Sequence, residues 1–216
     1  MITNSFPVTS TTSRDSSYSL TGSGSLTLEA GTYYILMVGG GSGGAHIKYG
    51  SSLNLNTSVG GGAGGCIKGL INITEKTTLS YSVGKGSTQL IGIASYSYSM
   101  AYSRLTDAGG NTSITLKGVT MTAYGGTGAG LDTENSHVKG VGGSTTISSN
   151  GEYYLTTANG MSGEGSGVYS YTVRGEYVGG VEYNGVLYGA GGAADDTSSS
   201  QPKRDGTDGC LIIVKT

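Results

Sequence analysis

Residues 30–44 read Ala-Gly-Thr-Tyr-Tyr-Ile-Leu-Met-Val-Gly-Gly-Gly-Ser-Gly-Gly, an apolar run that passes directly into a block of glycines. The part from Tyr33 to Val38 is continuously apolar rather than alternating, which is typical of a short strand buried on both faces. The block that follows leaves the backbone almost without side chains. A strand that leads directly into a glycine block is therefore the structural unit that we expect to recur along the chain.

Short apolar or alternating segments of the same kind occupy most of the sequence. Ser25-Leu-Thr-Leu-Glu alternates polar and apolar residues, as a half-buried strand does. No window shows an apolar stripe with a 3.6-residue period and helix caps, so the sequence predicts an all-β fold resembling a β-sandwich. The further predicted strands cover residues 67–73, 78–83, 88–93, 113–116, 119–123, 144–147, 153–156, 168–173, 181–183, 186–188 and 210–214.

The 42 glycines of this 216-residue chain gather in blocks between the strands. They could form flexible or tight loops, which lose much entropy on ordering. Alternatively, the missing side chains let backbones approach more closely than any Cβ would allow, as extended segments similar to polyproline II, bundled to satisfy their hydrogen bonds. We favour packing, because blocks that abut apolar strands make poor linkers. The blocks are residues 39–44, 60–65, 125–130, 140–143, 163–167 and 189–192.

Composition excludes several classes of protein. The net charge of −2 and the pI near 5.6 leave no basic stripe with which to bind nucleic acid. No run approaches the roughly 20 apolar residues that span a membrane, and the N-terminus shows no signal peptide. Only 2 prolines and no strict third-residue glycine period exclude collagen.

Residue patterns that would indicate a catalytic, cofactor-binding or metal site are weak in this sequence. Residues 39–44 and 60–65 match the Gly-x-Gly-x-x-Gly pattern of dinucleotide-binding sites. No helix follows either match to hold the pyrophosphate, so no cofactor is expected. His46 and His137 lack neighbours at metal-ligand spacing and are expected at the surface or in loops. Residues 195–208 predict a solvated polar loop without the acidic spacing of an EF-hand. Paired acids would serve glycoside hydrolysis, but no pair stands out among Glu152, Glu164, Glu176, Glu182, Asp195 and Asp196. We therefore expect a protein that is not an enzyme.

The two cysteines, Cys66 and Cys210, each follow a glycine and open an apolar strand. These matching contexts predict two small buried residues at strand starts, with neighbouring strands as one arrangement. A disulfide would need Cα atoms within about 7 Å. Assembly in a reducing cytoplasm, expected without a signal peptide, favours free thiols.

The 16 tyrosines are the most informative candidates for function. In one stretch every second residue is large, so an extended strand would project all four from one face: Tyr96, Tyr98, Met100 and Tyr102. A second set is interleaved with Gly, Ser and Asn, and it is the better candidate for receptor contact because its glycines indicate exposed turns: Tyr169, Tyr171, Tyr177, Tyr183 and Tyr188. Tyrosine among small polar residues makes adaptable contact surfaces, as in antibody paratopes, and its ring stacks on sugars. Packing in the core or in a subunit interface is the open alternative, since tyrosine favours strands.

A further set of motifs follows Ala30–Gly44 in order: Gly60-Gly-Gly-Ala-Gly-Gly-Cys-Ile-Lys-Gly-Leu-Ile-Asn-Ile, Leu79-Ser-Tyr-Ser-Val-Gly-Lys-Gly, Gly110-Asn-Thr-Ser-Ile, Tyr124-Gly-Gly-Thr-Gly-Ala-Gly and Asp208-Gly-Cys-Leu-Ile-Ile-Val. This order resembles the glycine-rich domain of bacteriophage tail-fibre and receptor-binding proteins, over residues 25–216. The glycine runs here are shorter and more mixed with Ser and Tyr than that family shows, and a long N-terminal shaft is missing.

The resemblance implies a non-catalytic component of the virion surface, made in the host cytoplasm and forming homotrimers. It implies a tail-fibre tip that binds a host glycan or protein, with the tyrosines as contact residues. A capsid-attached head fibre or decoration protein is the alternative. In both cases residues 1–24 would attach a domain formed by residues 25–216 to other virion proteins, without nucleic acid binding or membrane insertion.

Overall fold

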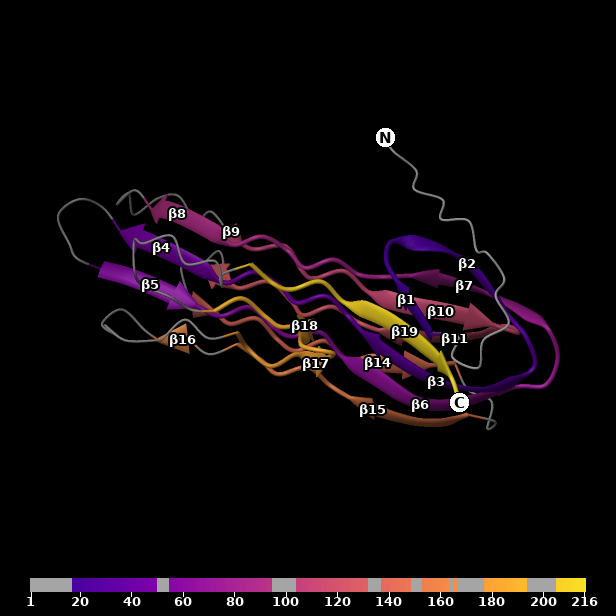
Figure 1. The fold of residues 1–216 in the computed structure, drawn as a ribbon. Helices are drawn as coiled ribbons and strands as arrows, with labels where there is room; N and C mark the ends of the chain where they lie inside the picture. The colour runs from indigo at the N-terminus through magenta and orange to yellow at the C-terminus, as the bar shows by residue number, and fades with distance from the viewer. Residues whose placement is uncertain are drawn as a thin grey trace.

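The computed structural model describes residues 17–49, 55–94, 104–131, 137–148, 153–163, 165–166, 177–193 and 205–216. Within these ranges the chain is all-β, with strands and extended segments and no helix, which confirms the predicted fold class. Figure 1 shows an elongated body with a β-sandwich at the end that carries the C-terminus, smaller sheets at the opposite end, and thin, nearly parallel segments between them.

The sandwich consists of two five-stranded antiparallel sheets. Sheet A has the order β1-β19-β3-β6-β15 and sheet B the order β14-β11-β10-β7-β2. The strands of sheet A are β1 (Ser17–Leu20), β19 (Cys210–Lys215), β3 (Gly31–Val38), β6 (Cys66–Ile73) and β15 (Tyr154–Ala158). The strands of sheet B are β14 (Thr145–Ile147), β11 (Val119–Ala123), β10 (Thr112–Leu116), β7 (Thr77–Ser82) and β2 (Ser23–Leu28). Residues 17–20 and 23–24 thus belong to the sheets, in β1 and the start of β2.

The main core lies between sheets A and B. Strand β3 contributes Tyr33, Ile35 and Met37 to it, while Leu36 and Val38 face the outer side of sheet A. Both sets are buried, so the prediction of a strand covered on both faces is confirmed. The other sheet contributes Leu28, Leu79, Ile114, Leu116, Met121 and Ala123.

The opposite end of the molecule, the distal end, is formed by two small sheets (Figure 1). Sheet C has the order β16-β5-β4-β8, in which β4 and β8 run parallel, and sheet D the order β13-β12-β9. Their strands are β16 (Gly165–Ser166), β5 (Leu55–Val59), β4 (Ala45–Tyr49), β8 (Leu90–Ala94), β13 (His137–Val138), β12 (Gly130–Leu131) and β9 (Arg104–Leu105). A separate hairpin joins β17 (Val181–Tyr183) to β18 (Val186–Tyr188).

Extended glycine-containing segments fill the space between the two ends, and we call them the glycine lattice. Most of them link a sandwich strand to a distal strand, as residues 39–44 link β3 to β4 and residues 60–65 link β5 to β6. The chain therefore runs up and down the long axis repeatedly. The segments are residues 39–44, 60–65, 83–89, 106–111, 124–129, 139–144, 159–163, 189–193 and 205–209.

The lattice has a three-residue period, visible in the central segment 39–44. The N–H groups of its first three residues donate to three different neighbouring segments. The N–H group of the fourth residue donates again to the first of these segments. These bonds run from Gly39 N to Gly65 O (2.9 Å), Gly40 N to Gly110 O (2.8 Å), Gly41 N to Thr207 O (2.9 Å) and Ser42 N to Gly62 O (2.9 Å). A three-residue turn is that of polyproline II, which forms no hydrogen bonds within its own strand. Here the neighbours supply them.

Three more segments surround residues 39–44, in the directions in which side chains would point. A Cβ added at Gly40 or Gly43 would meet segment 83–89, and one added at Gly41 or Gly44 would meet segment 189–193. Along the third direction Gly39 faces segment 124–129, and the hydroxyl of Ser42 donates to Thr127 O there. The central segment thus has six neighbours. Glycine is required at its five glycine positions because neighbouring backbone occupies the place where a Cβ would lie, whereas the small side chain of Ser42 fits and bonds to its neighbour.

The glycine blocks are packed, as we expected, but three lattice segments fell outside the predicted blocks: residues 83–89, 106–111 and 205–209. For the block predicted at residues 163–167, the corresponding lattice segment begins earlier in the chain and covers residues 159–163. The last part of the predicted solvated loop, residues 205–208, lies outside the strands with Asp205 and Asp208 exposed, and it is also bonded to the lattice. There Asp205 and Asp208 accept hydrogen bonds from the N–H groups of Gln89 (2.6 Å) and Gly86 (2.8 Å).

Candidate functional site

The first set of candidate tyrosines is flanked by strands of the distal end. Strand β8 ends at Ala94 and β9 begins at Arg104 on either side of residues 95–103. The described strands on either side of residues 50–54 and of residues 132–136 belong to the same sheets C and D. Five of the predicted contact residues lie outside the described residues: Tyr96, Tyr98, Tyr102, Tyr169 and Tyr171.

The other predicted tyrosines lie on or beside the β17–β18 hairpin. Tyr183 and Tyr188 are half-buried against the outer-face cluster, the patch on the outer side of sheet A formed by Leu36, Val38, Cys66, Cys210 and Ile212. Burial raises the pKa of Tyr188, with Cys210 and Tyr183 contributing. The half-buried Tyr177 directly precedes the bridge between Val178 and Gly191. The packing interpretation thus holds for Tyr183 and Tyr188, and receptor contact at these positions stays a prediction.

The two cysteines lie in the outer-face cluster as free thiols, as the sequence favoured. In the strand register Val38 of β3 stands between them, opposite Cys210 on one side and Cys66 on the other. Two strand spacings amount to about 10 Å, more than the roughly 7 Å that a disulfide bridges. The cysteines therefore flank β3 rather than occupying neighbouring strands.

Both thiols are expected to be unreactive in the native protein. Burial raises the pKa of Cys66, and burial together with Cys66 raises the pKa of Cys210 from 9.0 to about 12. At pH 8 this lowers the thiolate fraction of Cys210 by about a thousandfold, and the thiolate is the reactive form. Modification by a soluble disulfide reagent should therefore follow unfolding, with urea-unfolded chain as the control. Rapid labelling of the folded chain would contradict the placement of these residues.

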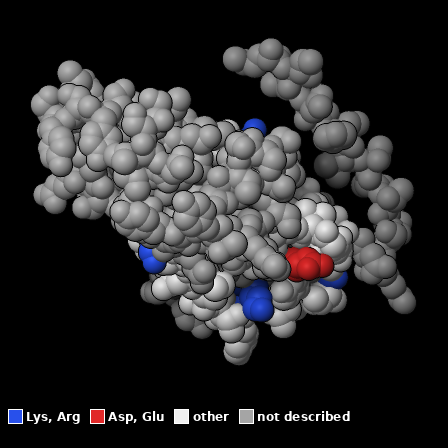
Figure 2. Space-filling view, turned by 90° about the vertical axis from the view of Figure 1, so that its left-hand side faces the viewer, with Lys and Arg blue, Asp and Glu red and all other residues white. Residues whose placement is uncertain are grey.

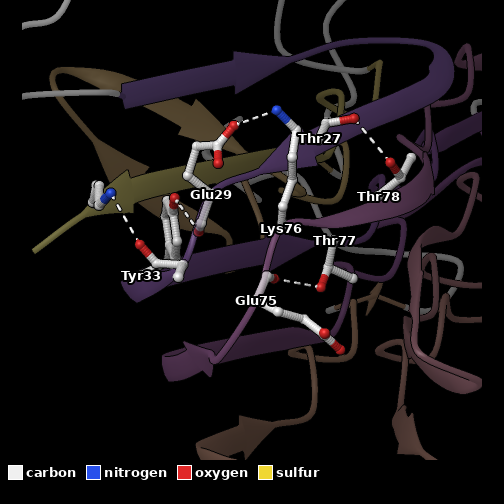
Figure 3. A network of polar contacts seen from close by, with 9 residues as sticks. Thr27, Glu29, Tyr33, Glu75, Lys76, Thr77 and Thr78 are labelled. Carbon is white, nitrogen blue, oxygen red and sulfur yellow. Dashed lines mark hydrogen bonds and ion pairs between the residues drawn. The ribbon is translucent and has the colours of Figure 1, made fainter.

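A polar network closes the sandwich at the end that carries the C-terminus (Figure 3). Lys76 pairs with Glu29 at 2.6 Å, and the Tyr33 hydroxyl donates to the Glu29 carbonyl at 2.9 Å. The hydrogen bond to Glu29 raises the pKa of Lys76. Both charged side chains are more than 60% exposed (67% and 63%), so the pair contributes little stability. The network ties the turn before β3 to the turn before β7 and offers no reactive group.

Titratable residues do not converge in the described part of the chain. His46 belongs to β4 and His137 to β13, so both lie in strands and not in loops, while their expected surface position stays a prediction. Glu182 is exposed on β17, while Glu152, Glu164, Glu176, Asp195 and Asp196 lie outside the described residues. Seen toward the distal end, the described residues carry only scattered charged side chains (Figure 2).

Two kinds of feature are absent from the described residues. No group of three or more His, Cys, Asp or Glu side chains could hold a metal ion there. Across the same ranges, no helix has the length and apolar character needed to cross a membrane.

Sequence reasoning missed one exposed apolar position on the sandwich. Tyr154 of β15 is 87% exposed and stands opposite Leu70, which is 41% exposed. The predicted strand at residues 153–156 contained Tyr154, but its sequence pattern did not indicate that β15 would lie at the edge of sheet A. Edge position is decided by the topology of the whole chain.

A family model described as a glycine-rich domain matches residues 18–210. This range begins within β1, covers the lattice and ends at the first residue of β19. No curated protein matches the chain.

Proposed function

The chain belongs to the glycine-rich domain family, and on that premise we propose that it is a non-catalytic bacteriophage fibre protein that binds the host receptor with its distal end. Other virion proteins hold it through its N-terminal residues. The receptor is a cell-surface glycan or protein, contacted by tyrosines. The family membership supports the glycine-rich β fold, and the resemblance to tail-fibre proteins supplies the biological setting.

The lattice supports this proposal because it makes the body a stiff spacer. Its segments are extended and are bonded to neighbours on several sides, as the bonds from Gly39, Gly40 and Gly41 illustrate. Bending the body would break hydrogen bonds between several segments together. A protein that presents a binding surface away from its anchor benefits from such a shaft.

The observation that carries the proposal is the position of the strands around residues 95–103. This stretch reads Ser-Tyr-Ser-Tyr-Ser-Met-Ala-Tyr-Ser, and β8 and β9, which flank it, lie at the distal end (Figure 1). Tyrosine among serines supplies large contact area at low entropic cost. Both described strands that flank the most paratope-like sequence of the chain therefore lie at the distal end, which supports the proposal.

A triple substitution of Tyr96, Tyr98 and Tyr102 by serine tests this proposal. We expect binding of the purified protein to host cells to fall at least tenfold, while the melting temperature changes by less than about 2 °C. Substitution of Ser95, Ser97 and Ser99 by alanine is the matched control, because it alters the alternate positions and keeps the tyrosines. Unchanged binding by the tyrosine variant would contradict the assignment of receptor contact to this stretch.

A structural role on the capsid is the second candidate, since a stiff lattice also serves particle architecture. Imaging of particles that carry a labelled copy of the chain separates the two. Label at the fibre tips supports the receptor-binding role, whereas label confined to the capsid would exclude it.

A further inference from the structure

Strand β15 forms an open edge of sheet A. Within the described residues it pairs only with β6, and the other side of the strand faces outward. Thr156, Thr157 and Ala158 are exposed, and Tyr154 is 87% exposed. The backbone N–H and C=O groups on that side form a template to which another strand can bond.

The edge lacks the features that usually block such pairing. Tyr154-Leu-Thr-Thr-Ala has no charge and no proline, and all five residues stay in register with β6, so no bulge interrupts it. The other sandwich edges are poorer templates. Strand β14 has three residues and β1 has four, while β2 contains Gly24 and is followed directly by the ion-paired Glu29.

The sequence of β15 is complementary to itself about Thr156. In an antiparallel pair centred there, Thr156 meets Thr156 of the second copy, and Tyr154 lies opposite Ala158. The large ring thus covers the smallest side chain of the strand, twice. Cross-strand pairs of threonines on one face favour such pairing, and the Tyr154 ring meets no bulky side chain at Ala158.

We propose that two copies of this chain associate through β15, about a two-fold axis at Thr156, so that sheet A continues from one copy into the other. An isologous contact of this kind closes on itself and stops at the dimer. This inference is independent of the proposed receptor binding.

The contact is small, which sets its strength. Five residues per copy, even with a tyrosine that offers roughly 150–250 Å², bury less than the roughly 800 Å² per partner of a standard interface. We therefore expect a weak dimer that dissociates on dilution, with a dissociation constant in the micromolar range or above.

Sedimentation velocity over a concentration series tests the proposal. The unaltered chain should shift from monomer to dimer as its concentration rises, and Thr156→Lys should stay monomeric, since two ammonium groups would meet on the axis. Ser25→Lys places the same charge on the edge strand β2 and should leave the dimer intact. A trimer, a monomer throughout, or an equal loss in both variants would overturn the inference.

A cross-linking variant tests the register itself. Directly opposed Cα atoms in an antiparallel pair lie about 4.5–5.5 Å apart, within the range for a disulfide. Thr156→Cys should therefore form a covalent dimer under mild oxidation, whereas Ser25→Cys should not. Equal cross-linking of both variants would contradict two-fold pairing at β15.

Discussion

Substitution of Gly41 by alanine is expected to abolish folding of the chain. Gly41 lies in the centre of the lattice, where its N–H donates to Thr207 O at 2.9 Å and its carbonyl accepts from Ser87 N at 3.0 Å. A Cβ on Gly41 would fall on the carbonyl of Ala190, closer than real Cβ atoms approach any atom. Because that carbonyl is backbone, it cannot turn away as a side chain would.

The cost of this one methyl group follows from what must move. Adding a methylene to an ordinary core costs typically 1–3 kcal/mol, since side chains nearby can adjust. Here two hydrogen-bonded segments must separate, so we expect at least about 4 kcal/mol. The total stability of a domain is about 5–15 kcal/mol, and the variant should be insoluble or largely unfolded.

Soluble yield and thermal unfolding measure the effect. Gly24→Ala is the matched control, because a Cβ there meets only the ring and hydroxyl of Tyr81, a side chain that can shift. We expect Gly24→Ala to fold with a melting temperature within about 3 °C of the unaltered chain. A folded Gly41→Ala variant of normal stability would contradict the close packing of the lattice.

The strands that could be predicted from the sequence are those whose own apolar pattern determines the structure. Tyr33–Val38 and residues 119–123 are strands because their side chains supply the core of the sandwich, and the apolar pattern showed this. Strand β5, Leu-Asn-Thr-Ser-Val, was missed because its letters are mostly polar. It exists because β4 and β16 pair with it, which only the complete topology reveals.

The missed lattice segments carried a signal that glycine counting could not detect. In segment 83–89 the exposed residues are Lys85 and Thr88, and in segment 205–209 they are Asp205 and Asp208. These side chains recur every third residue because one direction of a three-residue turn faces water at the lattice surface. A search for that period, rather than for runs of glycine, would have found these two segments.

The candidate site was less predictable than the fold. The tyrosines were identified from residue type and spacing, but Tyr183 and Tyr188 pack on sheet A.

The second large effect is expected at Thr112, whose hydroxyl joins strands β10 and β3 to the lattice segment 83–89. It is fully buried at the start of β10, donates to the Val38 carbonyl of β3 at 2.6 Å and accepts from the N–H of Gly84, just beyond β7, at 3.0 Å. Thr112→Val keeps the shape of the side chain but leaves both backbone groups without this partner. Each unsatisfied buried group costs about 1–3 kcal/mol, so we expect a loss of about 2–5 kcal/mol.

In a chain of this length that loss lowers the melting temperature by roughly 5–15 °C, which calorimetry or circular dichroism can measure. Thr112→Ser should recover most of the stability, because it keeps the hydroxyl and removes only a methyl group. Thr115→Val provides the comparison on the same strand, where the hydroxyl is exposed and contacts only Thr120 at 3.0 Å. Equal effects of the valine substitutions at 112 and 115 would mean that strand propensity, rather than the buried hydroxyl, decides stability. A large loss confined to Thr112 would show that the sandwich and the lattice are joined by side-chain hydrogen bonds where β3 passes from one into the other.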